Sequence, residues 1–387
     1  MKEPRALKIL HCPDLIGGHP YGIAKAERTI GLSSHCIALR PHPFGYPADQ
    51  ILSSGSEISA QLARWRLLGL AMGNYDVIHF NFGQSTMPQR IPEVASSKAG
   101  YPSWAKCLYN AYASILEFKD LSLLKRMGKG IVMTYQGDDA RQGDFLTSRY
   151  KISPADEAGY YTEKSDRFKR ERIKIVDRYA DAIFALNPDL LHVLPARARF
   201  MPYAHLDIAG TQPVPSSSRS VPIVVHAPSH RGVKGTRFVL DAVKRLKSEG
   251  IRLEFVLVEG VSHAEAMKLY ADADILVDQL LVGWYGGLAV ELMALGKPVV
   301  AYIREDDMGF IPSAMRADLP VVNATPGSIY NVLRELLTAR RHELGAIGMR
   351  SRQYVETWHD PIRVASLLKA TYVGLIQSED THQTTRS

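Results

Sequence analysis

Short apolar runs alternate with longer stretches of helical periodicity along the whole chain. In the first half, the apolar runs that predict buried strands lie at 6–10, 36–39, 76–80, 131–135 and 182–185. The helical patterns between them lie near 21–30, 57–72, 104–127 and 155–179. This alternation predicts parallel strands that are covered by helices on both faces of the sheet.

The same alternation starts again after segment 209–222, which is rich in proline and serine, lacks periodicity and is typical of a linker. The later strands are predicted at 221–226, 253–258, 274–277, 298–302 and 320–322, and the later helices at 236–247, 263–271, 287–295 and 326–339. A chain of 387 residues is long enough for two cores. We therefore expect an α/β protein with two Rossmann-like, doubly wound domains, 1–208 and 209–357, facing each other across a cleft. Ligands of such folds bind at the carboxyl ends of the strands.

The chain carries a formal net charge of +7, and its densest basic stretch is the helical pattern at 164–178. A solvated helix face explains this stretch most simply, and attraction to an anionic lipid surface is the alternative. No recognisable nucleic-acid-binding module is present, so we expect no nucleic-acid partner. Trp65 and the apolar pattern at 104–127 are compatible with membrane contact, but core packing is the simpler interpretation.

The three cysteines show no CxxC spacing, which favours a reducing compartment and argues against structural zinc. No apolar run has the length that a membrane span needs, and no apolar segment follows Lys2 as it would in a secretory signal. We therefore expect a cytoplasmic protein, either free or attached peripherally to the inner face of a membrane.

The loop after the first predicted strand contains Gly17-Gly18-His19-Pro20 and leads into a helix. Glycines allow a backbone to approach a ligand closely, and a helix start favours an anion. A plain tight turn is the alternative.

A second loop, at 226–236, reads His-Ala-Pro-Ser-His-Arg-Gly-Val-Lys-Gly-Thr and lies between a strand and a helix. Arg231 can clamp phosphate oxygens through two hydrogen bonds, and Lys234 supplies a compact charge. These cations and the helix dipole would stabilise a departing diphosphate without a metal. A solvated turn is the competing interpretation.

The third candidate is the helix start at Gly286-Gly287-Leu288, followed by Glu291. Backbone N–H groups there can hold phosphate oxygens, and Glu291 can accept hydrogen bonds from ribose hydroxyls. A structural salt bridge is the other explanation for a buried carboxylate.

The last two segments resemble the donor-binding half of retaining glycosyltransferases of the GT-B fold, particularly family 4. The resemblance implies that Arg231 and Lys234 contact the donor diphosphate, that Glu291 binds the ribose, and that Tyr285, Gly286, Gly287 and Leu288 line the phosphate and sugar edge. It also implies that Gly17 and Gly18 form a donor loop, and that 358–380 is a terminal helix completing the first domain.

The segment Gly137-Asp138-Asp139-Ala140-Arg141 resembles the acceptor-side loop of the same family. By resemblance, Asp138 joins Arg231 and Lys234 as a catalytic candidate, and the acceptor-side candidates are Asn81, Gln136, Asp139 and Arg141. The implied reaction moves a sugar from a UDP- or GDP-linked donor to a glycan, a lipid-linked acceptor or a small molecule. It implies no cofactor and no metal.

Three positions depart from the family pattern. Gly283 stands where relatives carry a first glutamate, which commonly meets the transferred sugar. Gln136 and Asn81 stand where histidines are common, and neither can take a proton, so we assign no general base. Two alternatives therefore stay open: a GT-B-like sugar-nucleotide epimerase and a non-catalytic nucleotide-sugar-binding protein.

Asp272 and Asp274 match a metal-binding Asp-x-Asp sequence only superficially. They lie at the end of a predicted helix, where acidic residues commonly cap the helix or are solvated.

Overall fold

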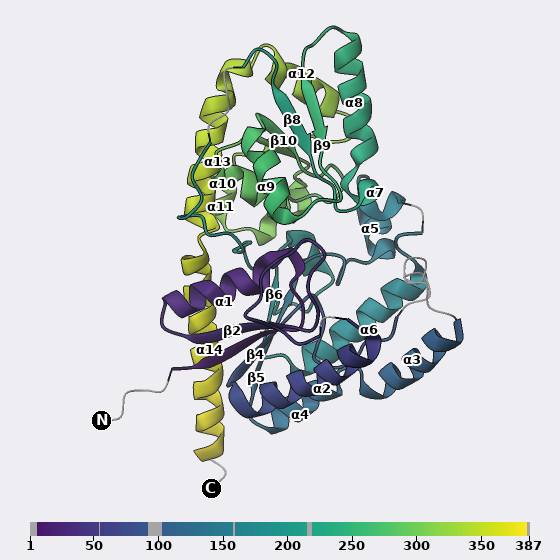
Figure 1. Cartoon of the computed structure of the whole chain (residues 1–387), viewed down its shortest axis with the longest axis vertical. Coiled ribbons are helices and arrows are strands. Elements are labelled where there is room, and N and C mark those ends of the chain that lie inside the picture. Colours follow the sequence, from purple (N-terminus) through teal and green to yellow (C-terminus); the bar gives the residue numbers. More distant parts are fainter. Residues whose placement is uncertain (1–5, 54, 92–102, 158, 215–218, 385–387) are drawn as a thin grey trace. The chain divides into compact units, whose positions relative to one another are not determined.

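The computed structural model of the chain describes all residues except 1–5, 54, 92–102, 158, 215–218 and 385–387 (Figure 1). It divides into two compact units. The first comprises 1–142, 162–205 and 361–387, and the second comprises 143–161 and 206–360. Segment 143–161, which we expected in the first domain, packs with the second unit.

The first unit is built around a parallel sheet in the order β3-β2-β1-β4-β5-β6-β7. Its strands are β1 (Lys8–Cys12), β2 (Ser33–Ala38), β3 (Gln50–Ile51), β4 (Val77–Asn81), β5 (Gly130–Tyr135), β6 (Ala182–Ala185) and β7 (Arg199–Phe200). Its helices are α1 (His19–Thr29), α2 (Glu57–Asn74), α3 (Ser103–Leu116), α4 (Lys119–Arg126), α6 (Glu163–Tyr179) and α14 (Pro361–Thr384).

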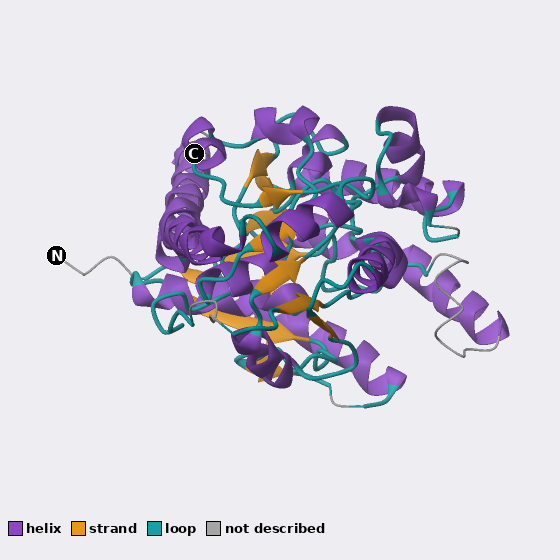
Figure 2. Ribbon diagram, turned by 90° about the horizontal axis from the view of Figure 1, so that it is seen from above, coloured by secondary structure: helices purple, strands orange, loops and turns teal. Residues whose placement is uncertain are grey.

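Alternate residues of each strand enter different cores because side chains of a strand point to opposite faces of the sheet. On β1, Leu10 and Cys12 join the core beneath α2, α4 and α6, whereas Ile9 joins the core beneath α1 and α14. The second core includes Tyr372 of α14, whose hydroxyl donates to Glu27 of α1 at 2.9 Å. The terminal helix therefore completes the first unit, as the sequence predicted. Helices flank the strands on both sides (Figure 2).

The second unit contains a parallel sheet in the order β12-β11-β10-β8-β9. Its strands are β8 (Ile223–His226), β9 (Glu254–Leu257), β10 (Ile275–Val277), β11 (Val299–Ala301) and β12 (Val322–Asn323). Its α-helices are α5 (Gly143–Arg149), α7 (Arg231–Lys234), α8 (Thr236–Ser248), α9 (His263–Asp272), α10 (Gly287–Ala294), α11 (Ser313–Ala317), α12 (Ile329–Leu337) and α13 (Leu344–Trp358). Strand residues such as Val224, Ile275 and Val300 pack with α8 and α12 on one face.

Two parallel, helix-flanked sheets confirm the α/β prediction, and each predicted strand has a counterpart. Two predicted helices differ. The helix expected at 104–127 breaks at Phe118, whose backbone is left-handed (φ 59°). The helix expected from 155 begins only at Glu163, where Thr162 and Ser165 form a capping box. Ser153 instead caps a single 3₁₀ turn, and Gly159 (φ 73°) lies between the two.

The basic stretch at 164–178 lies on α6, and many of its charges are engaged. Arg172 pairs with Glu117 at 2.9 Å, Lys169 donates to the Arg141 carbonyl at 2.5 Å, and Arg170 donates to Gln142 at 3.1 Å. A purely solvated helix face is therefore only part of the explanation.

The prediction that core packing accounts for Trp65 and Trp104 is wrong, because these side chains are 48% and 68% exposed.

Candidate functional site

The sheet of the second unit reverses its strand order between β8 and β10. Loops that follow such neighbouring parallel strands diverge and leave room for a ligand at their carboxyl ends. The loop after β8 ends in the short helix α7, and the loop after β10 ends at the start of α10. The predicted donor-binding residues of this unit lie in or next to these loops, as the sequence reasoning expected.

Lys234 lies at this point of strand reversal. Its ammonium group donates a hydrogen bond to Gln279, and the Gln279 amide donates in turn to the Trp284 carbonyl. A side-chain carbon placed on Gly286 would lie 3.6 Å from the Lys234 nitrogen. The ammonium group is therefore held beside the backbone that starts α10.

The start of α10 has no side-chain cap. The Gly286 N–H is held by the Asp278 carboxylate at 2.7 Å, whereas the first helical residues, Gly287 and Leu288, follow without a capping side chain. An uncapped helix start presents backbone N–H groups and the positive end of the helix dipole. Together with Lys234, this geometry suits a group that carries negatively charged oxygens.

Arg231 forms a bidentate ion pair with Glu259, which lies in the loop after β9, and the distance from Arg231 Nε to Glu259 Oε1 is 2.8 Å. The pair is exposed, and Glu259 raises the pKa of Arg231 while Arg231 lowers the pKa of Glu259. A cavity of about 260 Å³ lies beside Arg231 and is also lined by Glu157 and Arg237. An anionic ligand of Arg231 would have to compete with Glu259.

Glu291 is buried and accepts a hydrogen bond from His263 at 2.8 Å. His263 is the first residue of α9, and sequence reasoning missed it. The sequence could have indicated it only through its position, which is shortly after a strand and directly after the serine that caps α9. The salt bridge that the sequence analysis left open as an alternative is present, and a ribose would share the carboxylate with His263.

The His263–Glu291 contact predicts a pH-dependent stability. Glu291 raises the pKa of His263 above its usual value despite partial burial. A raised folded-state pKa means that the contribution is complete below about pH 6.5, the unfolded value, and is lost as the pH rises through the folded pKa. We expect the melting temperature of wild type to exceed that of His263→Gln at about pH 6 and the difference to shrink by about pH 9. A difference that is constant with pH would contradict the ion pair.

Tyr285 does not expose its side chain to a ligand. It is fully buried, and its hydroxyl lies 2.9 Å from the Tyr354 hydroxyl and 2.8 Å from His359 Nε2. Its role in the structure is to tie the loop after β10 to α13. A ligand contact at this position is left to the backbone.

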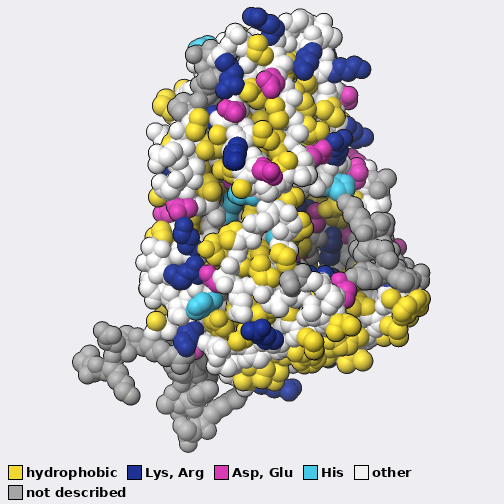
Figure 3. All heavy atoms as spheres, in the orientation of Figure 1, with side chains coloured by type: hydrophobic (Ala, Val, Ile, Leu, Met, Phe, Trp, Pro, Cys, Tyr) yellow, Lys and Arg dark blue, Asp and Glu magenta, His cyan; other side chains and the backbone are white. Residues whose placement is uncertain are grey.

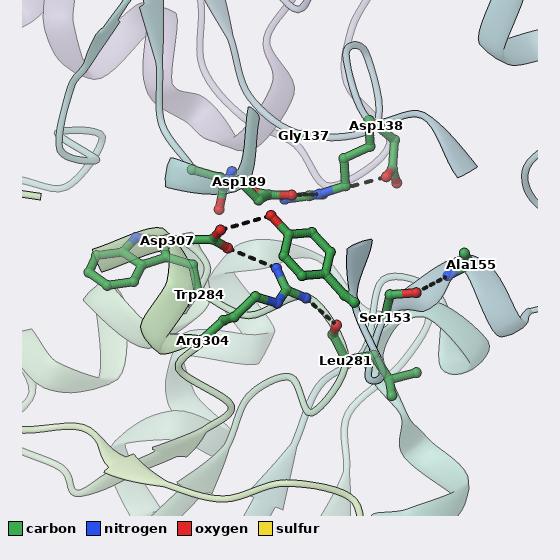
Figure 4. A network of polar contacts seen from close by, with 12 residues as sticks. Gly137, Asp138, Ser153, Ala155, Asp189, Leu281, Trp284, Arg304 and Asp307 are labelled. Atoms are coloured by element: carbon green, nitrogen blue, oxygen red, sulfur yellow. Dashed lines mark hydrogen bonds and ion pairs between the residues drawn. The ribbon is translucent and has the colours of Figure 1, made fainter. Parts of the chain in front are cut away.

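Gly283 cannot be replaced by a larger residue without a rearrangement. Its φ is +92°, and an added side-chain carbon would lie 2.5 Å from the guanidinium carbon of Arg304. Arg304 is buried and pairs with the buried Asp307 at 2.8 Å (Figure 4). The guanidinium also lies 3.7 Å from the centre of the Tyr150 ring, and the Tyr150 hydroxyl donates to Asp307 at 2.8 Å. A buried cation thus fills the space that a side chain at 283 would need.

The first unit has a similar point of strand reversal between β1 and β4. Gly17 and Gly18 follow β1 with left-handed backbones (φ 62° and 67°) and lead directly into α1. The Gln136 side-chain oxygen lies 3.9 Å from the position of a carbon added to Gly17. The glycine loop and the loop after β5 therefore meet at this edge of the sheet.

The loop after β5 is shaped by carboxylates. Asp139 accepts hydrogen bonds from the N–H groups of Gln136 and Gly137, at 3.0 and 2.6 Å, and burial raises its pKa to about 6. Arg141 donates to Asp189 at 2.6 Å and lies 3.5 Å from Asp138. Asp139 and Arg141 thus hold the loop in place, whereas Asp138 is about a third exposed.

Several buried polar atoms of the first unit have no hydrogen-bond partner within the described residues, and three of them lie near the carboxyl ends of its strands: Asn81 Oδ1, Gln136 Nε2 and His19 Nε2. The three residues follow or end β4, β5 and β1 respectively. Buried polar groups in native proteins are nearly always paired, so these atoms indicate a bound polar ligand or water.

His19 was quoted in the glycine loop but not identified as a site residue. Its Nδ1 accepts from the Ala204 N–H at 3.4 Å. Burial lowers its pKa well below the usual value, so the ring is neutral at pH 7, and its proton is on Nε2. His19 therefore presents a hydrogen-bond donor.

Asp274, the second acid of the Asp-x-Asp sequence, has a structural contact. Asp274 is buried and accepts from the Ile223 N–H at 2.8 Å, so it ties the start of β8 to β10. Across the described parts of the chain, no cluster of three or more His, Cys, Asp or Glu side chains could hold a metal ion.

None of the helices within the described parts of the chain is long and apolar enough to cross a membrane.

No protein-family model matches this chain, and no curated protein sequence matches it either. Solved structures do. Sucrose-phosphate synthase from Thermosynechococcus elongatus is similar over 97% of this chain and 100% of that chain (TM-score 0.56, 14% identity). HepE of Anabaena, in complex with UDP-glucose, matches over 95% of this chain and 100% of that chain (TM-score 0.56, 13% identity).

A third similar structure is an α-glucosyltransferase in complex with UDP and a 13-mer DNA, which covers 95% of this chain and 99% of its own (TM-score 0.55, 10% identity). Similarity at such identities shows the fold. This chain has the two-unit α/β fold of GT-B glycosyltransferases.

Proposed function

We propose that this protein is a glycosyltransferase that moves a sugar from a nucleoside-diphosphate sugar to an acceptor hydroxyl. One observation carries the proposal: the Lys234 ammonium group lies beside Gly286 at the uncapped start of α10, where the sheet reverses its strand order. A cation at a helix start favours a diphosphate, because both the charge and the backbone N–H groups bind its oxygens.

A nucleotide donor is also supported by the similar solved structures. HepE was solved with UDP-glucose and the α-glucosyltransferase with UDP. We propose a UDP- or GDP-linked donor for this chain, with the diphosphate at Lys234 and α10, and the ribose at Glu291 beside His263.

In the proposed reaction, the acceptor oxygen bonds to the anomeric carbon while the bond from that carbon to the donor phosphate breaks. The nucleoside diphosphate leaves with the electron pair and accepts the acceptor proton, so no protein base is needed. Attack from the face of the departing phosphate retains the configuration. Lys234 and the α10 dipole stabilise the negative charge that grows on the diphosphate, and their contribution is largest in the transition state. We propose that this makes a metal unnecessary.

The first unit supplies the polar groups that an acceptor would need. We propose that Asn81 Oδ1 accepts from a ligand hydroxyl, and that Gln136 Nε2 and His19 Nε2 donate to ligand oxygens. The buried, unpaired state of these atoms supports the assignment. Asp138, the more exposed carboxylate of the loop after β5, is proposed as a further contact with the reacting groups.

A product screen tests the proposal. The protein is incubated with UDP- and GDP-sugars and with glycan, lipid-linked or small-molecule acceptors, and products are read by mass spectrometry. A new glycoside together with free nucleoside diphosphate supports transfer. A changed donor sugar without any acceptor would identify an epimerase, and donor binding without any product would identify a binding protein.

The Arg231–Glu259 ion pair gives a separate prediction. Glu259→Gln removes the carboxylate that competes for Arg231, so we expect the affinity for UDP or GDP to rise several-fold, on the scale of exposed ion pairs of up to about 1 kcal/mol. Arg231→Gln should lower the affinity, and Glu259→Gln in that background should have no further effect. Isothermal titration calorimetry measures all three variants. An unchanged affinity in Glu259→Gln would show that Arg231 does not bind the diphosphate.

A further inference from the structure

The helices α2, α3 and α4 carry large apolar side chains that face the solvent. On α2 these are Ile58, Leu62 and Trp65, and on α3 they are Trp104, Leu108 and Ile115, all between 48% and 76% exposed. Leu123 and Met127 add exposed apolar area at α4. Because α4 packs against both α2 and α3, these residues form one region, defined here as the α2–α4 surface. Hydrophobic side chains gather over these helices in Figure 3.

The exposed positions follow the helical repeat. Ile58, Leu62 and Trp65 are spaced by four and three residues, as are Trp104, Leu108 and the exposed Ala111, so each set lies along one side of its helix. The opposite side of α2 is already buried in the core through residues such as Ala63 and Leu67. A helix that is apolar on both its inner and its outer side is usually buried on both sides. The outer side therefore needs a partner that the core does not supply.

The charges around the α2–α4 surface are basic. Arg66 on α2, and Lys119 and Arg126 on α4, are exposed. The helix α3 contains no acidic residue. The acids of the other two helices are Glu57, which pairs with Arg40 at 2.6 Å, and Asp120, which is buried and accepts from Ser85 and Thr86. The net exposed charge of the three helices is therefore positive, because Glu57 is the one exposed acid on them and is paired.

We propose that the α2–α4 surface docks the protein on an anionic lipid bilayer. Trp65, Trp104 and the aliphatic side chains would enter the boundary between headgroups and acyl chains, and Arg66, Lys119 and Arg126 would contact anionic headgroups. A second copy of the chain fits the surface less well. A two-fold interface on this surface would bring the same three basic side chains of both copies together, and like charges at an interface oppose association.

Vesicle co-sedimentation tests the proposal. We expect the wild-type protein to bind vesicles of about equal parts phosphatidylcholine and phosphatidylglycerol, and to be released as salt is raised. Leu108→Ser combined with Ile115→Ser should lower the partition coefficient about tenfold or more, because two apolar side chains no longer enter the bilayer. Lys119→Gln combined with Arg126→Gln should lower binding to these vesicles and weaken its salt dependence, and should leave binding to pure phosphatidylcholine unchanged.

The matched control combines Met349→Ser with Lys247→Gln. Met349 is 65% exposed, as Leu108 is, but both control residues lie in the second unit. The control should bind vesicles as wild type does. Absence of wild-type binding at low salt, or an equal loss in the control, would overturn the proposal. So would a concentration-dependent dimer that Leu108→Ser abolishes, since this would make a second copy the partner. None of these measurements depends on sugar transfer.

Discussion

Replacing Lys234 by alanine is expected to lower kcat/KM for sugar transfer roughly 100- to 1000-fold, the scale on which one preorganised charge-stabilising group contributes. The physical reason is the position of the ammonium group beside Gly286 and the start of α10. The variant keeps the helix dipole but loses the cation that we propose stabilises the departing diphosphate. Steady-state kinetics with a donor and an acceptor that yield product measure the effect.

The control for Lys234→Ala is Lys244→Ala, which removes an exposed lysine from the neighbouring helix α8. It should leave kcat/KM unchanged. A Lys234→Ala variant with wild-type kcat/KM and an unchanged melting temperature would remove Lys234 from the reaction. A loss confined to KM would restrict it to donor binding.

Replacing Arg304 by methionine is expected to lower the free energy of unfolding by about 3–5 kcal/mol. The reason is the burial of both partners. Arg304 and Asp307 are 3% and 0% exposed, and the substitution removes the cation that pairs with the buried Asp307 carboxylate, which also accepts a hydrogen bond from the Tyr150 hydroxyl. Urea denaturation followed by circular dichroism measures the loss. Arg252→Met, at an exposed arginine of the same unit, should change stability little.

The double variant Arg304→Met with Asp307→Leu separates the cost of a lone buried charge from the worth of the pair. Replacing both partners by apolar residues avoids a buried carboxylate that lacks its cation, so we expect the double variant to be more stable than Arg304→Met alone. If the double variant were less stable than the single one, loss of packing over Tyr150 rather than charge would explain the effect.

The positions of the candidate donor residues in the fold were predictable because their signals are local in sequence. The glycines at 286 and 287 and the cations at 231 and 234 each follow a predicted strand, and the rule for parallel sheets then places them at one edge. The fold was predictable for the same reason, because each strand and helix can be recognised from the pattern of apolar residues in a short segment.

The remaining features depend on contacts between distant residues. Glu259 pairs with Arg231, His263 with Glu291, and Arg304 fills the space beside Gly283. Nothing in the local pattern selects these partners. Periodicity also failed for α2 and α3, because it locates apolar positions on a helix but cannot tell an apolar side that faces the core from one that faces outward.

The helix α14 has a consequence for how the chain folds during synthesis. The first unit buries Ile9, Val77 and Phe184 beneath α1 and α14, yet α14 is made only after the whole of 206–360. Domains generally fold as they leave the ribosome, with the N-terminal part first. Here all residues of the second unit have been synthesised while one face of the first sheet still lacks the helix formed by residues 361–384. The first unit is therefore completed only after the second unit has been synthesised.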